Sequence, residues 1–208
     1  MPMVTRTTRA PRSDAARNQR LIIEAAAEVF AEQGVEASME EIAARAGVGV
    51  GTVYRRFPGK DVLVDELVSL VFNDVITAGE AALAQADGTG LEAFLRALGQ
   101  SFADHRRYAS LLLGRTRSDC GASVVRSQII ELYDAAHKAK TLGPDARLGD
   151  VMALVWGMRG IVEASGDIAP HAWKRYLDVH LAGLRQTGRL SKTPAITSTQ
   201  IGDLARAR

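Results

Sequence analysis

The feature that most constrains the fold of this sequence is a series of closely spaced helix stops between residues 34 and 59. Before the first stop, apolar residues recur at three- and four-residue intervals over residues 21–30, which places them on one face of a helix. Gly34 ends that helix, Gly47 permits a tight exit from a second, and Pro58 disfavours helical geometry in the residue before it. The pattern predicts one helix followed by two very short helices.

The two short helices have the composition of a helix-turn-helix. Ser38 and Glu41 fit a capping box, in which the Ser hydroxyl accepts from the Glu backbone N–H and the carboxylate reaches back. A hairpin whose second helix enters the DNA major groove needs a small residue, a Gly-like turn and apolar anchors. These are supplied by Ala43, by Gly47, and by Ile42, Val48 and Val53. A helical hairpin without a DNA-binding function can also match this spacing.

Residues 20–63 resemble the DNA-binding domain of the TetR family of bacterial repressors. The resemblance rests on Ile22-Ile23-Glu24-Ala25-Ala26 with Phe30 and Gly34, on Ile42-Ala43 and Ala46-Gly47-Val48, and on Gly51-Thr52-Val53-Tyr54 with Phe57 and Lys60. It implies an all-α fold of about nine helices, with an N-terminal three-helix helix-turn-helix domain and a C-terminal helical bundle for ligand binding and dimerisation. It also implies a ligand-responsive repressor that binds palindromic double-stranded operator DNA as a homodimer. Activation stays open, because polarity depends on where the operator lies relative to a promoter.

The residues expected to reach DNA lie mostly in the third helix and are Ser38, Gly49, Val50, Gly51, Thr52, Tyr54, Arg55, Arg56 and Lys60. A tyrosine hydroxyl can donate to a phosphate, and an arginine can bind a phosphate or pair with both acceptors of a guanine edge. Lys60 opens the fourth helix, where backbone amides and the ammonium group together suit a phosphate. Core packing is the alternative for Tyr54, and a solvated helix end is the alternative for Arg55 and Arg56.

The opening of the third helix, Gly49-Val50-Gly51, departs from the family's pattern, since many relatives carry a hydroxyl residue or a lysine there. Val50 can contact a thymine methyl group, and the glycines allow the backbone to approach DNA closely. Sequence preference is therefore expected to depend more on Thr52, on Arg55 and on the N-terminal arm.

Charge and periodicity suggest four segments. The formal net charge is only +2, but residues 1–20 hold five arginines against one acidic residue. We expect residues 1–16 to form a flexible basic arm, either solvated or lying in a DNA groove. The helix-turn-helix domain should span residues 17–60, and the effector-binding and dimerisation domain residues 61–189. Residues 190–208 lose apolar periodicity and are expected to be a mobile tail.

The C-terminal domain should be a bundle that binds the effector and a second copy of the chain. Apolar periodicity predicts helices at about 60–85, 91–104, 106–117, 121–140, 146–165 and 170–186. The side chains expected to line an apolar effector cavity are Phe94, Leu98, Phe102, Tyr108, Tyr133, Met152 and Trp156, with a plain packed core as the alternative. The residues expected to pair across a two-fold axis are Trp156, Gly160, Trp173, Leu177 and Leu181, with a monomeric, buried C-terminal hairpin as the alternative.

Enzymatic and membrane functions find little support in the sequence. The four histidines are scattered, and the single cysteine, Cys120, has no partners at zinc-site spacing, so we expect no catalytic residues, metal or cofactor. No apolar run approaches the ~20 residues that span a bilayer, and no signal-peptide stretch precedes Leu21, so we expect a cytoplasmic protein. The competing hypothesis is an all-helical enzyme or small-molecule carrier whose first three helices only stabilise the fold.

Overall fold

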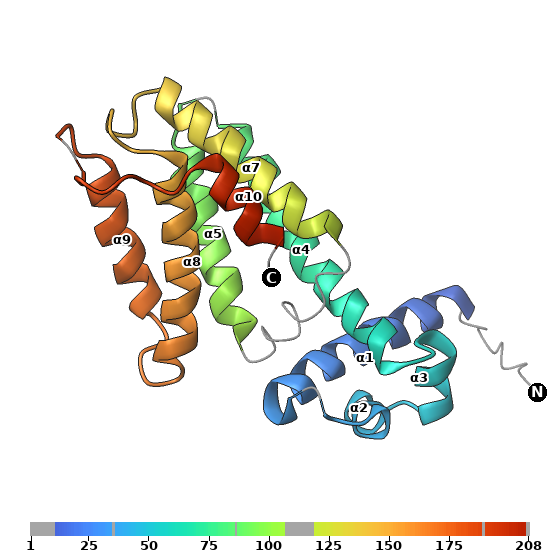
Figure 1. The fold of residues 1–208 in the computed structure, drawn as a ribbon. Coiled ribbons are helices and arrows are strands. Elements are labelled where there is room, and N and C mark those ends of the chain that lie inside the picture. Colours follow the sequence, from blue (N-terminus) through green and yellow to red (C-terminus); the bar gives the residue numbers. More distant parts are fainter. Residues whose placement is uncertain (1–10, 35, 86, 107–118, 189, 207–208) are drawn as a thin grey trace, which may run out of the picture. The chain divides into compact units, whose positions relative to one another are not determined.

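The computed structural model of the chain describes residues 11–34, 36–85, 87–106, 119–188 and 190–206. Within these ranges every regular element of appreciable length is an α-helix, which confirms the predicted all-α fold (Figure 1). The helices are α1 (Pro11–Gln33), α2 (Met39–Ala46), α3 (Val50–Arg56), α4 (Lys60–Leu83), α5 (Gly90–Asp104), α7 (Asp119–Lys138), α8 (Leu148–Ser165), α9 (Ala172–Leu184) and α10 (Ser198–Arg206). In the described parts of the chain, none of them is both long and apolar enough to cross a membrane. The helix predicted over 106–117 falls almost entirely outside the described residues.

The chain divides into two compact units, an N-terminal unit of Met1–Val68 and a C-terminal unit of Ser69–Arg208. In the N-terminal unit, α2 packs on both α1 and α3. Phe30 of α1, Ile42 of α2 and Val53 of α3 are completely buried in its core. Burial of each such side chain contributes roughly 1.5–3 kcal/mol, which is how helices too short to be stable in isolation persist here.

Helix α1 begins at Pro11, so residues 11–16 are helical and do not belong to a flexible arm as predicted. Proline is compatible with the first turn of a helix, because its missing N–H removes no hydrogen bond there. Asp14 lies in the same turn, where its negative charge interacts favourably with the helix dipole. The side chains of residues 14–17 are exposed. A solvent-facing helical turn needs no apolar periodicity, which is the signal on which the prediction relied. Residues 1–10 lie outside the described part of the chain.

The C-terminal unit is a helical bundle in which α5 contacts α7, α8 and α9, and α8 also contacts α7, α9 and α10. Phe94 of α5, Leu132 of α7, Met158 of α8 and Leu177 of α9 are fully buried in one continuous core. Gly99 lets α5 approach α9 closely, since a Cβ at this position would lie 2.4 Å from the ring of Trp173. The bundle therefore fills its interior with large side chains and uses a glycine where two elements would otherwise collide.

The predicted mobile tail over residues 190–208 is wrong for residues Ser198–Arg206, because they form helix α10. Thr197 and Gln200 cap its first turn reciprocally, with the Thr197 backbone N–H donating to the Gln200 side chain at 2.9 Å. Ile201 is buried against the core of the C-terminal unit, and α10 contacts α8. One apolar anchor and a cap are sufficient here because α8 supplies the surface against which this short segment folds.

Candidate nucleic-acid interface and ligand cavity

The turn between α2 and α3 has the geometry that the sequence predicts. The Ser38 hydroxyl accepts from the Glu41 backbone N–H at 3.2 Å, and the Ser38 N–H donates to the Glu41 carboxylate at 2.7 Å, which confirms the capping box. Gly47 adopts the left-handed conformation with φ 67° and ψ 29°, and the following Val48 N–H donates to the Ala43 carbonyl at 3.1 Å. The direction of α3 is thus fixed by hydrogen bonds at the turn and by its buried Val53.

Helix α3 presents most of its surface to solvent. Val50 is 41% exposed and Tyr54 is 44% exposed, and they lie four residues apart, on the same stripe of the helix. The alternative of core packing for Tyr54 therefore does not hold. The Tyr54 hydroxyl donates to Glu40 at 3.4 Å, and Gly51 on the same helix is also exposed. An apolar group next to a hydroxyl donor forms a surface that suits the wall of a DNA groove.

Two cations at the end of α3 are held in place by neutral partners. A terminal nitrogen of Arg55 donates to the Thr52 hydroxyl at 3.0 Å. A terminal nitrogen of Arg56 donates to the Gln19 side-chain oxygen at 2.6 Å, and the Gln19 amide nitrogen donates to Glu66 at 3.3 Å. Because a neutral acceptor orders a guanidinium without cancelling its charge, Arg56 is positioned and still fully cationic.

Gln19 was missed by sequence reasoning, because its partner Arg56 is 37 positions away. The available signal was weak: Gln19 precedes the buried Ile22 by three residues, which places it at the edge of the apolar face of α1. An open groove of about 510 Å³ lies between α1 and α3, bordered by Asn18 and Gln19 on one side and Thr52 on the other. The N-terminal half of α1 thus belongs to the candidate interface.

Ser38 and Lys60 have roles in the local structure besides any contact with DNA. The backbone N–H of Ser38, then its hydroxyl, and also the charge of Lys60 hold the pKa of Glu41 below its usual value. Lys60 is half-buried as the first residue of α4, and Gly49 caps α3 without a side-chain hydrogen bond. The carboxylate of Glu41 therefore offsets part of the Lys60 charge.

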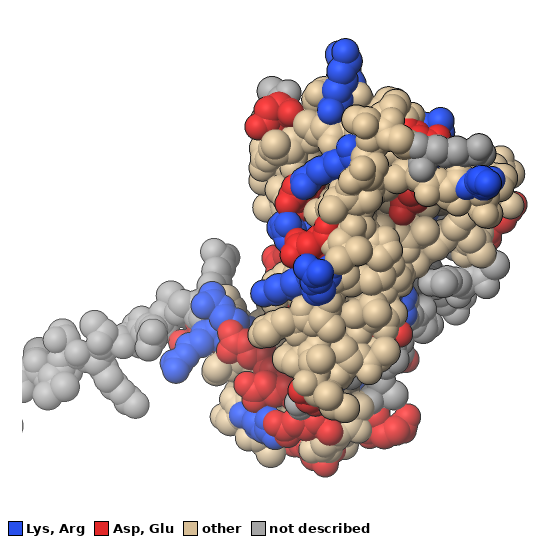
Figure 2. Space-filling model, turned by 90° about the vertical axis from the view of Figure 1, so that its left-hand side faces the viewer, with Lys and Arg blue, Asp and Glu red and all other residues tan. Residues whose placement is uncertain are grey.

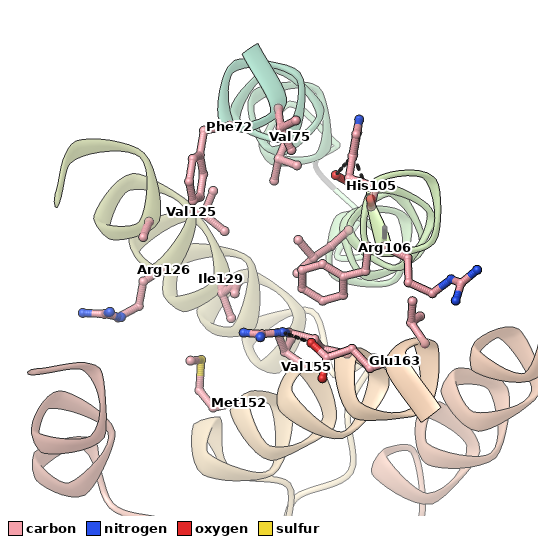
Figure 3. A pocket seen from close by; sticks show the side chains of 17 residues that line it. Phe72, Val75, His105, Arg106, Val125, Arg126, Ile129, Met152, Val155 and Glu163 are labelled. Atoms are coloured by element: carbon pink, nitrogen blue, oxygen red, sulfur yellow. Dashed lines mark hydrogen bonds and ion pairs between the residues drawn. The ribbon is translucent and has the colours of Figure 1, made fainter. Parts of the chain in front are cut away.

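A cavity of about 220 Å³ lies inside the C-terminal unit, between α4, α5, α7 and α8 (Figure 3). Its walls are mostly apolar and include Phe72 and Val75 of α4 and Ile129 of α7. Arg126, Arg159 and Glu163 also border it, and the Arg159 Nε donates to Glu163 at 2.9 Å. The mostly apolar walls suit an apolar group, and the charged groups at the border can orient it.

The predicted ligand residues are only partly brought together. Leu98, Phe102 and Met152 line the cavity. Phe94 is completely buried in the packed core, so for this residue the alternative of plain core packing holds. Tyr133 borders a different, more polar hollow and its hydroxyl donates to the Ala146 carbonyl at 3.2 Å. Trp156 does not line the cavity, and Tyr108 lies outside the described residues.

Three of the residues predicted to bind a partner subunit face the interior of their own chain. Trp173, Leu177 and Leu181 are at most 3% exposed and belong to the core of the C-terminal unit. The prediction is wrong for these residues because an apolar stripe at helical spacing looks the same whether it packs inside the chain or against another chain. Trp156 is half-buried and Gly160 is exposed, so both are accessible at the surface of α8.

The outer face of α8 and α9 is built from small and aromatic residues. The Tyr176 side chain lies directly on α8, since a Cβ at Gly157 would be 1.9 Å from its hydroxyl oxygen. Its ring packs on His180 with 4.0 Å between the ring centroids. One turn after Gly157, nothing lies within 4 Å of a Cβ built on Gly160. Figure 2, which shows the side of the molecule where α8 and α9 lie, displays a broad expanse free of charged groups.

Comparison with known proteins shows which family of proteins this chain resembles. A family model for bacterial regulatory proteins of the tetR family matches residues 22–67. Over 67 residues the chain is 42% identical to an HTH-type transcriptional regulator of Staphylococcus aureus, a match that spans 32% of this chain and only 36% of that relative. A TetR transcription regulatory protein from Mycobacterium vanbaalenii is 30% identical, with a TM-score of 0.63 and coverage of 85% of this chain and 100% of the other. A TetR transcriptional regulator from Streptomyces coelicolor is 28% identical, with a TM-score of 0.63 and coverage of 82% and 99%.

The family model matches the helix-turn-helix and the start of α4, and the structural likeness extends through the helical C-terminal unit. The family consists of regulators that bind DNA, not of enzymes. The chain belongs to the TetR family of bacterial transcriptional regulators.

Proposed function

We propose that this protein is a ligand-responsive repressor that binds a palindromic operator as a homodimer and is released by a small, largely apolar effector. The observation that carries the proposal is the solvent-facing side of α3. Tyr54, Arg55 and Arg56 are exposed there on a helix held by the buried Val53. Donors and cations fixed on a rigid, exposed helix are what recognition of the major groove requires.

The residues divide into those that position the protein on DNA and those that read bases. Tyr54 and Lys60 suit phosphates, one as a hydroxyl donor and the other as a cation at the start of a helix. Arg56, ordered by Gln19, is a third phosphate ligand. Val50 suits a thymine methyl group and Arg55 a guanine edge.

A homodimer forms in this proposal through the outer face of α8 and α9. Trp156 and Gly160 of α8 and Tyr176 of α9 are accessible there, and the face is largely uncharged (Figure 2). An isologous pairing of this face would bury its apolar groups and bring Gly160 of one copy close to α8 of the other. Two reading heads related by a two-fold axis match two half-sites about 34–36 Å apart.

Helix α4 is the element that connects effector binding to DNA binding in this proposal. Val71, Phe72 and Val75 of α4 border the cavity, and the same continuous helix begins at Lys60, four positions after the end of α3. An effector that favours one placement of α4 changes the separation of the reading heads. A coupling of roughly 1–3 kcal/mol would lower operator affinity about 5- to 150-fold.

The proposal is tested by selecting bound fragments from the source genome with the full-length protein and titrating the recovered operator. We expect a palindromic site, a complex of two chains per site, and effectors that weaken binding. By linkage, operator must weaken effector binding by the same factor. An effector whose affinity is equal with and without operator would contradict the ligand-responsive part of the proposal, and a non-palindromic site bound by one chain would contradict the dimer.

A further inference from the structure

The size and walls of the cavity in the C-terminal unit limit the body of its ligand. Its walls carry aliphatic side chains from four helices, among them Val75, Leu98, Ile129 and Val155. The cavity volume is about 220 Å³, and an engineered apolar cavity of roughly 150 Å³ is enough to bind benzene. In proportion, the cavity has room for an apolar body of roughly nine non-hydrogen atoms.

The rim of the cavity carries more positive than negative charge. Arg106 donates to Asp167 at 2.5 Å. Since Asp167 is not part of the lining, the positive charge of Arg106 is balanced by a carboxylate outside the cavity. The Arg159 Nε donates to Glu163 at 2.9 Å (dashed in Figure 3). Arg126 forms no hydrogen bond or ion pair with any residue that the structure describes, although it is half-buried. One positive charge at the rim is therefore uncompensated within the described part of the chain.

Arg159 still has donors available after it pairs with Glu163. Its side chain is only 22% exposed, and Glu163 occupies the Nε donor. Its two terminal nitrogens make no hydrogen bond to the residues that the structure describes. The planar guanidinium group presents parallel N–H donors that match the two oxygens of a carboxylate.

A cationic ligand does not fit this rim. It would meet the guanidinium group of Arg159, and among the lining residues that the structure describes the one carboxylate, that of Glu163, is already paired with Arg159. A neutral apolar ligand would leave the positive charge of the half-buried Arg126 unmatched. An anion is the occupant that improves the charge balance of the site.

We infer that the cavity binds a small molecule with an apolar body and one carboxylate, held at the rim by the terminal nitrogens of Arg159, with the positive charge of Arg126 elsewhere in the same lining. This inference deepens the proposed function and rests on it in taking the cavity as the effector site. The carboxylate of Glu163 binds the Arg159 Nε and repels a second carboxylate at the same guanidinium group. The negative charge of Glu163 therefore opposes binding of the ligand.

The test compares three probes with the same eight-carbon chain, octanoate, 1-octanol and octylamine, by calorimetric titration of the full-length protein. At pH 7 the carboxylic acid is ionised and the amine is protonated. We expect octanoate to bind at least about tenfold more tightly than octanol, the ratio typical of one hydrogen bond to a charged group. Octanol or octylamine binding as tightly as octanoate, or no binding by any probe, would overturn the inference.

Two variants locate the carboxylate. Arg159→Met keeps the apolar stem and should lower octanoate affinity to that of octanol. Arg175→Met, at an exposed position of α9 outside the lining, should change neither the octanoate affinity nor the octanol affinity. Glu163→Gln keeps the side-chain volume and removes the competing charge, so it should raise octanoate affinity severalfold even if Arg159→Met fails to fold. A site for cations would instead lose affinity in Glu163→Gln, and that result would contradict the inference.

The same probes, added to the operator complex, separate this inference from the proposed function. Release of operator by octanoate, but not by octylamine, supports both. Octanoate that binds in the cavity without releasing operator upholds the carboxylate site and contradicts its proposed role in regulation. Release by octanol with no binding of octanoate leaves the repressor function standing and overturns the carboxylate site.

Discussion

Substitution of Gln19 by alanine should weaken operator binding without changing its dependence on salt. In the structure Gln19 accepts from Arg56 at 2.6 Å and donates to Glu66 at 3.3 Å, so it holds the arginine in one position with a neutral group. Without it, Arg56 must be ordered when DNA binds. Immobilising one such side chain costs about 0.5–1.5 kcal/mol, which corresponds to roughly 2- to 12-fold in affinity per half-site.

Substitution of Arg56 by alanine should give a different pattern, because it removes a charge. Each lost phosphate contact reduces the slope of log affinity against log salt concentration by about 0.9. The loss of operator affinity between 50 and 200 mM salt then becomes roughly 3.5-fold smaller than in the wild type. If both subunits on an operator lose the contact, it becomes roughly 12-fold smaller. Gln19→Ala leaves the number of cations unchanged, so its slope should equal that of the wild type.

Fluorescence anisotropy titrations at four salt concentrations would measure both effects. Asn18→Ala is a matched control, because Asn18 borders the same groove on α1 and hydrogen-bonds with no residue in the described part of the chain. Its affinity and slope should match the wild type. Wild-type affinity in Gln19→Ala would refute the positioning role of Gln19, and a slope reduced as much as in Arg56→Ala would show that Gln19 acts through charge.

Four further predictions concern the stability and the assembly of the protein. Ser38→Ala should lower the free energy of unfolding of the N-terminal unit by about 0.5–2 kcal/mol in a urea titration, since α2 loses its cap. An unfolding curve equal to that of the wild type would contradict a stabilising role of the cap. Because the pKa of Glu41 is lowered on folding, its stabilising effect is complete above the ordinary carboxyl pKa and is lost as pH falls through the lowered value; the acid limb of a stability curve should flatten in Glu41→Gln. Gly160→Trp should dissociate the dimer in sedimentation with unchanged helicity, while Glu131→Trp, an exposed position on α7, should not; a dimeric Gly160→Trp would place the interface elsewhere. Ile201→Ala should cost about 2–5 kcal/mol and expose α10 to proteolysis, and an unchanged digestion pattern would show that α10 is not anchored by this side chain.

The helix-turn-helix could be predicted in detail because its signals are local. The Ser38–Glu41 cap links residues three positions apart, and Gly47 takes a positive φ that other residues adopt only with strain. Pro58 stops α3 by a steric effect on its immediate neighbour. Each of these effects acts within one turn of the chain, so the sequence carries it in full.

The C-terminal unit could be predicted as a bundle, but the use of its surfaces could not. The stripe of Trp173, Leu177 and Leu181 specifies an apolar face without specifying its partner, and the structure places that face against α5, where Gly99 makes room for the tryptophan ring. Segment 198–206 is short and mostly polar, with Ile201 and Leu204 as its large apolar residues, and a helix of this length is marginal by itself. It folds because the core already offers a site for Ile201.

By itself the sequence determined where α1 ends and where the short helices α2 and α3 lie, that the chain is all-α, and which side chains α3 can offer to DNA. The tertiary structure alone decided that Gln19 orders Arg56, that Phe72, Arg126 and Arg159 meet at one cavity, and that the stripe on α9 faces inward. The physical reason is the range of the interactions. Caps, turns and helix periodicity act between residues at most a few positions apart, whereas a cavity or a hydrogen bond between distant residues exists only after packing has brought separate helices together.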